Sequence, residues 1–308
     1  MRCASAGARS CKRIKSVSLR TKSNDYNLYM LIDTHAHLNF AAYKDDIEEV
    51  ADRIVQQGMQ VINVGSQYST SQRAIELAEK YPQNMYAAVG LHPIHLFVTD
   101  VDESEIPFKS RQEVFSTEKY LKLTENPKVV AIGEMGIDYF HVPEGVDLKE
   151  FENTQAWTFV KGIQLAEKIG LPVILHCRGA NDNVNKAYND MLSILQQENF
   201  NNAVVHCFTA DWDVAKKFLD HGCMISFTGI ITYPKTKDLE KVVKKTPLDR
   251  LMVETDAPYL APQVVCGKRN EPRFVQYVAD RVAEIKGLSY DEVEDQTTAN
   301  AKNFFNLN

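Results

Sequence analysis

Eight short apolar runs, separated by polar breaks and helical stretches, constrain the fold of this chain more than any other feature of its sequence. The runs are rich in Val, Ile, Leu and Met and scarcely alternate with polar residues, which is typical of parallel strands buried on both faces. We therefore expect strands at residues 30–36, 59–65, 85–92, 129–136, 171–177, 203–208, 223–229 and 250–256.

The stretches between the runs carry apolar residues at helical spacing, most clearly at 45–58, 71–81 and 157–170. The segment 93–127 is the longest irregular stretch, and we expect a loop there with one helix at 112–124. Eight strands alternating with helices predict a closed (β/α)8 barrel of the TIM type in a single α/β domain. The first run is not followed by a GxGxxG motif, which argues against a dinucleotide-binding sheet.

The composition excludes several classes of protein. Hydrophobic residues make up 44% of the 308 residues and charged residues 25%, as in globular proteins. Apolar runs stay well short of the roughly 18 residues of a membrane helix, so we expect no membrane partner. The net charge of −6 argues against a broad nucleic-acid-binding surface. Six cysteines without a CxxC pair indicate reduced thiols, and we expect a cytoplasmic monomer.

Residues 1–29 differ from the rest of the chain. The first 23 residues contain seven Lys or Arg and no acidic residue. We interpret 1–29 as a basic, disordered extension and 30–308 as the barrel domain. The same composition matches a mitochondrial transit peptide, in which case the location would be mitochondrial.

Residue types that bind metal ions gather at the carboxyl ends of the apolar runs. In a barrel these ends meet at one mouth, where the active sites of this fold lie. His35 and His37 point to the same side of a strand, because residues i and i+2 share a face. The candidates at the ends are Asp33, His35, His37, His92, His95, Glu134, Asp138, His176, His206, Glu254 and Asp256. His141 and His221 do not lie at such ends.

Each of these residues alone has a simpler explanation, such as a buried hydrogen bond or a helix cap. Together they place several histidines and carboxylates at one mouth, a costly arrangement unless cations occupy it. Imidazole and carboxylate without thiolate suit Mg²⁺, Mn²⁺ or Zn²⁺. Because the donors outnumber what one catalytic ion needs, we expect two divalent ions that share the carboxylate of Glu134. Such a pair predicts a hydrolase.

With these residues the chain resembles the TatD family of metal-dependent deoxyribonucleases, within the amidohydrolase-like barrels. The resemblance runs from about residue 31 to 307 and is carried by IDTHAHL, GLHP, AIGEMGIDY, LPVILHCR, VVHCF, FTGIITY, ETDAPYLAP, GKRNEP and TTANAKNFF. It implies a TIM barrel with a binuclear metal site that hydrolyses phosphodiester bonds, typically in DNA. The metal ligands that it implies are His35, His37 and Asp256 for the first ion, His176 and His206 for the second, and Glu134 as the bridge.

The resemblance also implies supporting roles for His92 and Glu254 in catalysis. His92 would contact a substrate phosphate, and Glu254 would orient a ligand or water. The family's Arg-Asp-Ala run after the second-ion histidine is replaced here by CRGAND, which keeps Arg178 as a substrate contact but shifts the carboxylate to Asp182. This change and the long 93–127 segment bear on the identity of the substrate.

The expected reaction is the removal of nucleotides from DNA, from single strands or ends, as a 3′-5′ exonuclease. Asp256 would accept the proton of the attacking water, and the 3′-hydroxyl would leave. Lys268 and Arg269 are placed to meet phosphate oxygens. The simpler interpretation of that stretch is structural: Asn270 would cap the last large helix and Pro272 would lie in its first turn.

Two other functions fit the same residues. One is hydrolysis of a carbon–nitrogen or ester bond, including aminoacyl-tRNA deacylation, by the same metal pair. Related barrels often bridge their metals with a modified Lys from the fourth strand, and run 129–136 offers Glu134 but no Lys. The other is a barrel that binds metal and a partner without catalysis, for which a water-activating carboxylate would be missing; Glu134 and Asp256 are both present.

Overall fold

Eight parallel strands form one sheet in the computed structural model, which describes residues 31–98, 100–101 and 108–307. The expected extension at 1–29 lies outside these residues. The strands in sheet order are β1 (Ile32–Ala36), β2 (Gln60–Val64), β3 (Met85–Val89), β6 (Val129–Asp138), β7 (Val173–Arg178), β8 (Ala203–Val205), β9 (Met224–Phe227) and β10 (Leu251–Val253). All eight predicted runs are strands.

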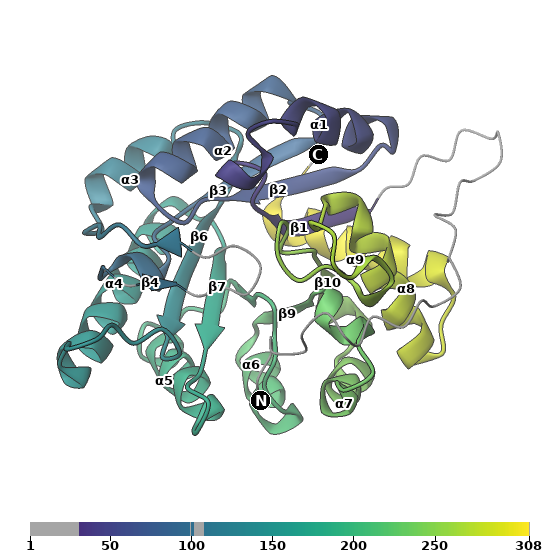
Figure 1. Cartoon of the computed structure of the whole chain (residues 1–308). Helices are drawn as coiled ribbons and strands as arrows, with labels where there is room; N and C mark the ends of the chain where they lie inside the picture. The colour runs from purple at the N-terminus through teal and green to yellow at the C-terminus, as the bar shows by residue number, and fades with distance from the viewer. Residues whose placement is uncertain (1–30, 99, 102–107, 308) are drawn as a thin grey trace.

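The sheet closes on itself where the chain returns from β10 to β1. The Asp256 amide donates to the His35 carbonyl at 2.9 Å, and the His37 amide donates to the Ala257 carbonyl at 2.7 Å. Ala36 and Ala257 form a parallel bridge beside these bonds. The prediction of a single-domain (β/α)8 barrel is therefore confirmed, and the helices surround the strands (Figure 1).

The helices of the described chain follow the strands in sequence. They are α1 (Ile47–Gln56), α2 (Tyr68–Lys80), α3 (Thr117–Leu123), α4 (Leu148–Ile169), α5 (Val184–Gln197), α6 (Trp212–His221), α7 (Lys237–Lys245), α8 (Val275–Lys286) and α9 (Tyr290–Phe305). Within the described chain, we find no helix with the length and apolar character needed to cross a bilayer.

All four predicted helices begin at other residues than expected, and the shift is larger for α3 and α4 than for α1 and α2. α4 begins before the predicted 157, because the Asp147 side chain accepts a hydrogen bond from the Glu150 amide at 2.9 Å and caps the helix. α3 begins at Thr117 and not at 112, with Ser116 as its cap. The segment before α3 also contains a short antiparallel pair that was not predicted, formed by β4 (Asp100–Val101) and β5 (Phe108–Lys109).

Apolar side chains fill the inside of the barrel and the space between the strands and the outer helices. The inner cluster combines one or two residues of each strand with the end of α9, and comprises Ile32, Ile62, Val64, Tyr86, Ala88, Val130, Ala131, Ile174, Val204, Met224, Met252, Ala301, Phe305 and Leu307. Phe305 at the end of α9 and Leu307 after it pack against the inner strand residues, and the polar strand ends lie at the carboxyl end of the barrel.

Helix α4 approaches β6 closely at Gly162. A Cβ atom at this position would lie 1.9 Å from the Met135 Sδ and 2.2 Å from its Cε. Met135 is fully buried in the middle of β6, so its side chain has no solvent to move into. The glycine therefore allows the helix to pack against the strand segment that carries Glu134.

We expect Gly162→Ala to lower stability. Overpacking of this kind costs about 1–3 kcal/mol, and the better helix propensity of Ala offsets up to about 1 kcal/mol of that. The melting temperature, followed by circular dichroism, should fall by about 2–4 °C for each net kcal/mol in a chain of this size. Glu167→Ala, at an exposed position of the same helix, is the control. A Gly162→Ala melting temperature equal to that of the wild type would contradict the tight approach.

Candidate metal centre at the carboxyl ends of the strands

The six residues expected to bind metal lie together at the carboxyl ends of five strands. His35 belongs to β1 and His37 follows it, Glu134 lies in β6, and His176 lies in β7. His206 follows β8 directly, and Asp256 follows β10. The Nε2 atoms of His35 and His37 are 3.2 Å apart, as the spacing of the two residues predicts. Asp256 Oδ1 is 3.7 Å from the first of these nitrogens and 3.3 Å from the second.

Glu134 lies at the centre, and its two oxygens face different histidines. Oε2 is 3.5 Å from His35 Nε2 and 3.8 Å from His37 Nε2. Oε1 is 2.9 Å from His176 Nδ1 and 3.1 Å from His206 Nε2. The carboxylate therefore joins two groups of donors, one of which also includes Asp256.

The hydrogen bonds behind the histidines decide which ring nitrogen faces the centre without a proton. His37 Nδ1 lies 2.8 Å from the Val64 carbonyl, which can only accept, so Nδ1 carries the hydrogen and Nε2 is bare. In neutral His206, Nδ1 donates to Glu254 at 3.0 Å, which again leaves Nε2 bare. His176 is turned around: Nε2 faces Asp138 at 3.2 Å, and Nδ1 faces Glu134.

These bare nitrogens point at each other and at a carboxylate, an arrangement that repels unless positive charge lies between them. Imidazole rings whose second nitrogen is held by a carbonyl or carboxylate are the usual ligands of divalent cations in proteins. Four groups of three residues in the described chain could each hold an ion, and every expected ligand except Asp256 belongs to at least one of them. The donor set therefore fits metal binding.

The pKa shifts point the same way. Burial lowers the pKa of His206, but the charges of Glu254 and Glu134 outweigh burial and raise it well above its ordinary value. Burial raises the pKa of Glu134, yet the surrounding histidines His206, His92 and His35 hold it well below its ordinary value. The centre thus keeps Glu134 ionised and attracts positive charge.

Glu254 lies behind the centre and not in it. It is buried, and its Oε1 accepts hydrogen bonds from His206 Nδ1 and, at 2.6 Å, from the Cys207 amide. Its Oε2 accepts from the Ser226 hydroxyl at 2.7 Å. The supporting role of Glu254, orientation of a ligand or water, stays a prediction.

His92 differs from the other histidines in the nitrogen that it presents. Its Nδ1 accepts a hydrogen bond from the Ile94 amide at 3.0 Å, so in the neutral ring Nε2 carries the hydrogen. This N–H lies 3.7 Å from Glu134 Oε1 and is suited to donate to an oxygen at the centre. His95 lies behind it, with ring centres 6.5 Å apart, and burial lowers the pKa of His95 to about 4.

Asp138 and His141 form a part of the site to which the sequence analysis gave no role. Asp138 Oδ2 lies 3.2 Å from His176 Nε2 and 2.7 Å from His141 Nδ1. The placement of His141 away from the strand ends was wrong, because β6 continues past 136 to Asp138 and a tight turn brings His141 back. The Asp-x-x-His spacing is a signal that could have indicated this pair.

The three basic residues expected to contact substrate lie in different surroundings. Arg178 ends β7, and its guanidinium lies over the Phe140 ring at 4.0 Å. Lys268 is exposed. Arg269 is paired with Asp46 at 2.5 and 2.8 Å, so a phosphate would have to compete with this carboxylate. Substrate contact by all three stays a prediction.

Asn270 does not cap a helix, contrary to the structural interpretation of the GKRNEP segment. Its side-chain nitrogen donates to the carbonyls of Thr255 and Tyr259 at 2.9 and 2.6 Å, which ties this segment to the loop that carries Asp256. Pro272 also lies outside the large helix, in a short 3-10 helix (Pro272–Phe274) that precedes α8.

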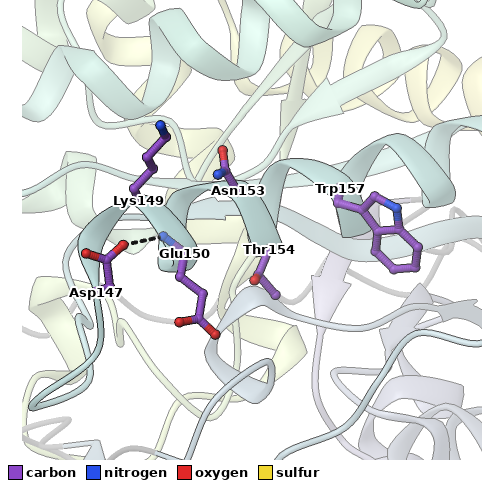
Figure 2. A pocket seen from close by; sticks show the side chains of 6 residues that line it. All are labelled: Asp147, Lys149, Glu150, Asn153, Thr154 and Trp157. Carbon is purple, nitrogen blue, oxygen red and sulfur yellow. Dashed lines mark hydrogen bonds between the residues drawn. The ribbon is translucent and has the colours of Figure 1, made fainter.

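A hollow of about 540 Å³ on the outside of the barrel is separate from this centre. It lies along the first turns of α4, where Asp147 caps the helix and Trp157 projects from it (Figure 2). Asp147, Lys149, Glu150, Asn153, Thr154 and Trp157 line it. Because it contains none of the histidines or carboxylates of the centre, it is not a candidate active site.

A closed parallel barrel with clustered histidines and carboxylates at its strand ends defines a class of metal-dependent hydrolases. Comparison with known families places the chain within that class. The family model described as TatD related DNase matches residues 32–306. The chain belongs to the TatD family.

Similar proteins cover nearly the whole chain. An uncharacterized metal-dependent hydrolase, YabD of Bacillus subtilis, is 37% identical over 91% of this chain and 100% of its own length. A protein named 3′-5′ ssDNA/RNA exonuclease TatD, from Erwinia tasmaniensis, is 30% identical over 90% of this chain and 100% of its own. The crystal structure of YjjV, a TatD homologue from Escherichia coli, superposes with a TM-score of 0.76 at 29% identity, covering 91% and 100% of the two chains.

We expect Glu254→Gln to weaken metal binding by about 10- to 100-fold, the usual effect of removing a carboxylate that orients a ligand histidine. The neutral amide holds the His206 N–H less strongly than the carboxylate does, and its NH2 group replaces the oxygen that accepts from the Ser226 hydroxyl. Titration of the metal-free protein with Mn²⁺ by calorimetry measures the change. Glu271→Gln, which removes a carboxylate paired with Arg53 outside the centre, should bind Mn²⁺ like the wild type. Equal affinities of Glu254→Gln and wild type would contradict the orienting role.

Proposed function

We propose that the chain is a deoxyribonuclease that removes nucleotides from single-stranded DNA or DNA ends in the 3′-to-5′ direction, using two divalent metal ions (Mg²⁺, Mn²⁺ or Zn²⁺). The observation that carries this proposal is the geometry of Glu134, whose two oxygens each face a separate pair of histidines. The family, described as DNase-related, and the name of the Erwinia relative support the choice of nucleic acid.

The ligands divide into two sets around Glu134. His35, His37 and Asp256 would hold one ion, and His176 and His206 the other. When bound, such a pair polarises the phosphoryl group, makes water a better nucleophile at neutral pH and stabilises the charge that develops in the transition state.

Asp256 is the group that we assign as general base. Its side chain is 14% exposed, against 4% for Glu134, so it reaches further toward the mouth where substrate enters. Its Oδ1 faces His35 and His37, which leaves Oδ2 to take the proton of the attacking water. The backbone holds Asp256 in a left-handed conformation, with φ of 57°, that is uncommon for non-glycine residues.

Other residues would position the substrate. The Nε2 hydrogen of His92 is available to a phosphate oxygen beside Glu134. Arg178, Lys268 and Arg269 are the candidate contacts to phosphates further along the strand. A cytoplasmic location and a monomeric state complete the proposal.

The test is digestion of single-stranded DNA carrying a 5′ label, with Mg²⁺ or Mn²⁺, by the purified wild type and by Asp256→Asn. We expect the wild type to shorten the labelled strand stepwise, and the variant to be slower by about 10²- to 10⁴-fold, the usual contribution of a general base. Addition of a chelator should abolish digestion by the wild type.

Asp249→Asn is the matched control, because this exposed aspartate precedes the other end of the same strand, β10. It should digest DNA like the wild type. Digestion by Asp256→Asn at the wild-type rate would refute the assigned base. Intact DNA together with cleavage of an aminoacyl ester would overturn the nuclease and favour the esterase alternative.

A further inference from the structure

A second hollow, of about 370 Å³, opens at the same end of the barrel as the metal centre. It lies between the start of α2 and the segment that leads into α3. Its lining residues are Gln67, Tyr68, Ser69, Arg111, Gln112, Glu113, Val114, Ser116, Lys119 and Tyr120. Most of them belong to the long segment between β3 and β6.

Hydrogen bonds to backbone carbonyls connect the walls of this hollow with the segments that carry His92 and His95. The Glu113 amide donates to the His95 carbonyl at 2.8 Å, and the Gln67 side chain donates to the Arg111 carbonyl at 2.8 Å. On the other wall, the His92 amide donates to the Ser66 carbonyl at 2.9 Å. His92 itself faces Glu134. The segments on either side of it therefore separate the hollow from the metal centre.

The hollow carries positive charge that the described residues do not neutralise. Arg111 and Lys119 are exposed, and neither side chain has an ion pair with any residue in the described ranges. Glu113 is the only acid in the lining, and its carboxylate accepts hydrogen bonds from the Tyr68 amide and, at 2.7 Å, from the Tyr120 hydroxyl. Its charge is thus directed at the start of α2 and at a neighbouring hydroxyl, so no carboxylate of the described residues pairs with the two cations.

Apolar and aromatic surface accompanies the charge. The half-buried Tyr68 ring lies 6.0 Å from the Lys119 Nζ and packs edge-on against Tyr120. Val114 is 75% exposed at the rim. A ligand that suits the hollow has an anionic part for the cations and a flat apolar part for this surface, which is the chemistry of a nucleotide.

From these contacts we infer that the hollow is a subsite for one nucleotide of the substrate strand away from the cleaved bond, with its phosphate held by Arg111 and Lys119. This inference rests on the proposed nuclease function, because it assigns the strand a path from Glu134 past His92 to the hollow. A dinucleotide would be cleaved without filling the subsite, whereas a longer strand would bind more tightly by reaching it.

The test compares the double variant Arg111→Gln/Lys119→Gln with Lys122→Gln, an exposed lysine of α3 that does not line the hollow. KM is measured for a thymidine dinucleotide and for a longer oligothymidine. We expect the wild type and Lys122→Gln to have a lower KM for the longer strand. In the double variant, the ratio of the KM for the dinucleotide to the KM for the longer strand should be about tenfold smaller. Its kcat for the longer strand should match that of Lys122→Gln.

Binding measured without cleavage separates the two proposals. The fluorescence anisotropy of a labelled oligothymidine gives the binding constant at each salt concentration. The slope of its logarithm against the logarithm of the salt concentration becomes shallower by about 0.7 for each phosphate of a single strand that the protein no longer neutralises. We therefore expect a slope shallower by about 0.7 in the double variant, which loses the contact to one phosphate. This change is expected even if the wild type cleaves no DNA, an outcome that would refute the nuclease alone.

Two results would overturn the subsite. One is a double variant that matches Lys122→Gln in both the KM ratio and the salt slope. The other is a wild type whose KM is the same for the dinucleotide and the longer strand. Melting curves of each variant check that the exposed substitutions leave the fold intact.

Discussion

The closing of the barrel between β10 and β1 is the constraint on which the rest of the structure depends. The two backbone hydrogen bonds across this seam involve His35, His37 and Asp256 themselves, so the contact that completes the sheet also sets the distance between three candidate ligands. Asn270 and the pair of Asp33 with Thr255 hold the loop after β10 from behind. A chain that failed to close here would have neither a barrel nor a metal centre.

A second layer of groups fixes the chemistry of the centre. A carbonyl behind His37, a glutamate behind His206 and an aspartate behind His176 each take the hydrogen of one ring nitrogen. In the neutral rings, the remaining nitrogens face inward as electron-pair donors. His92 has the opposite arrangement, since its inner nitrogen keeps the hydrogen. One cluster of similar rings therefore supplies both metal ligands and a hydrogen-bond donor.

The sequence predicts the strands and the six clustered residues because both follow from local pattern: buried parallel strands are continuous apolar runs, and their carboxyl ends meet. It does not predict what depends on contacts between distant segments. The pairing of Arg269 with Asp46 is of this kind. The capping of α4 by Asp147 and the return of His141 to Asp138 instead join residues three apart, so their spacing in the sequence could have indicated them. The cap wrongly expected of Asn270 shows the same limit, since its partners Thr255 and Tyr259 belong to another loop.

The packing of the end of α9 against the inner strand residues has a consequence for how substrate and product reach and leave the metal centre. Phe305 and Leu307 pack against the inner strand residues, so apolar side chains fill the barrel behind the metal centre. We therefore expect the product to leave through the mouth at the carboxyl ends of the strands, where the substrate entered. A released fragment and the next incoming molecule therefore compete for a single entrance, so the pace of turnover depends on how quickly that entrance is vacated.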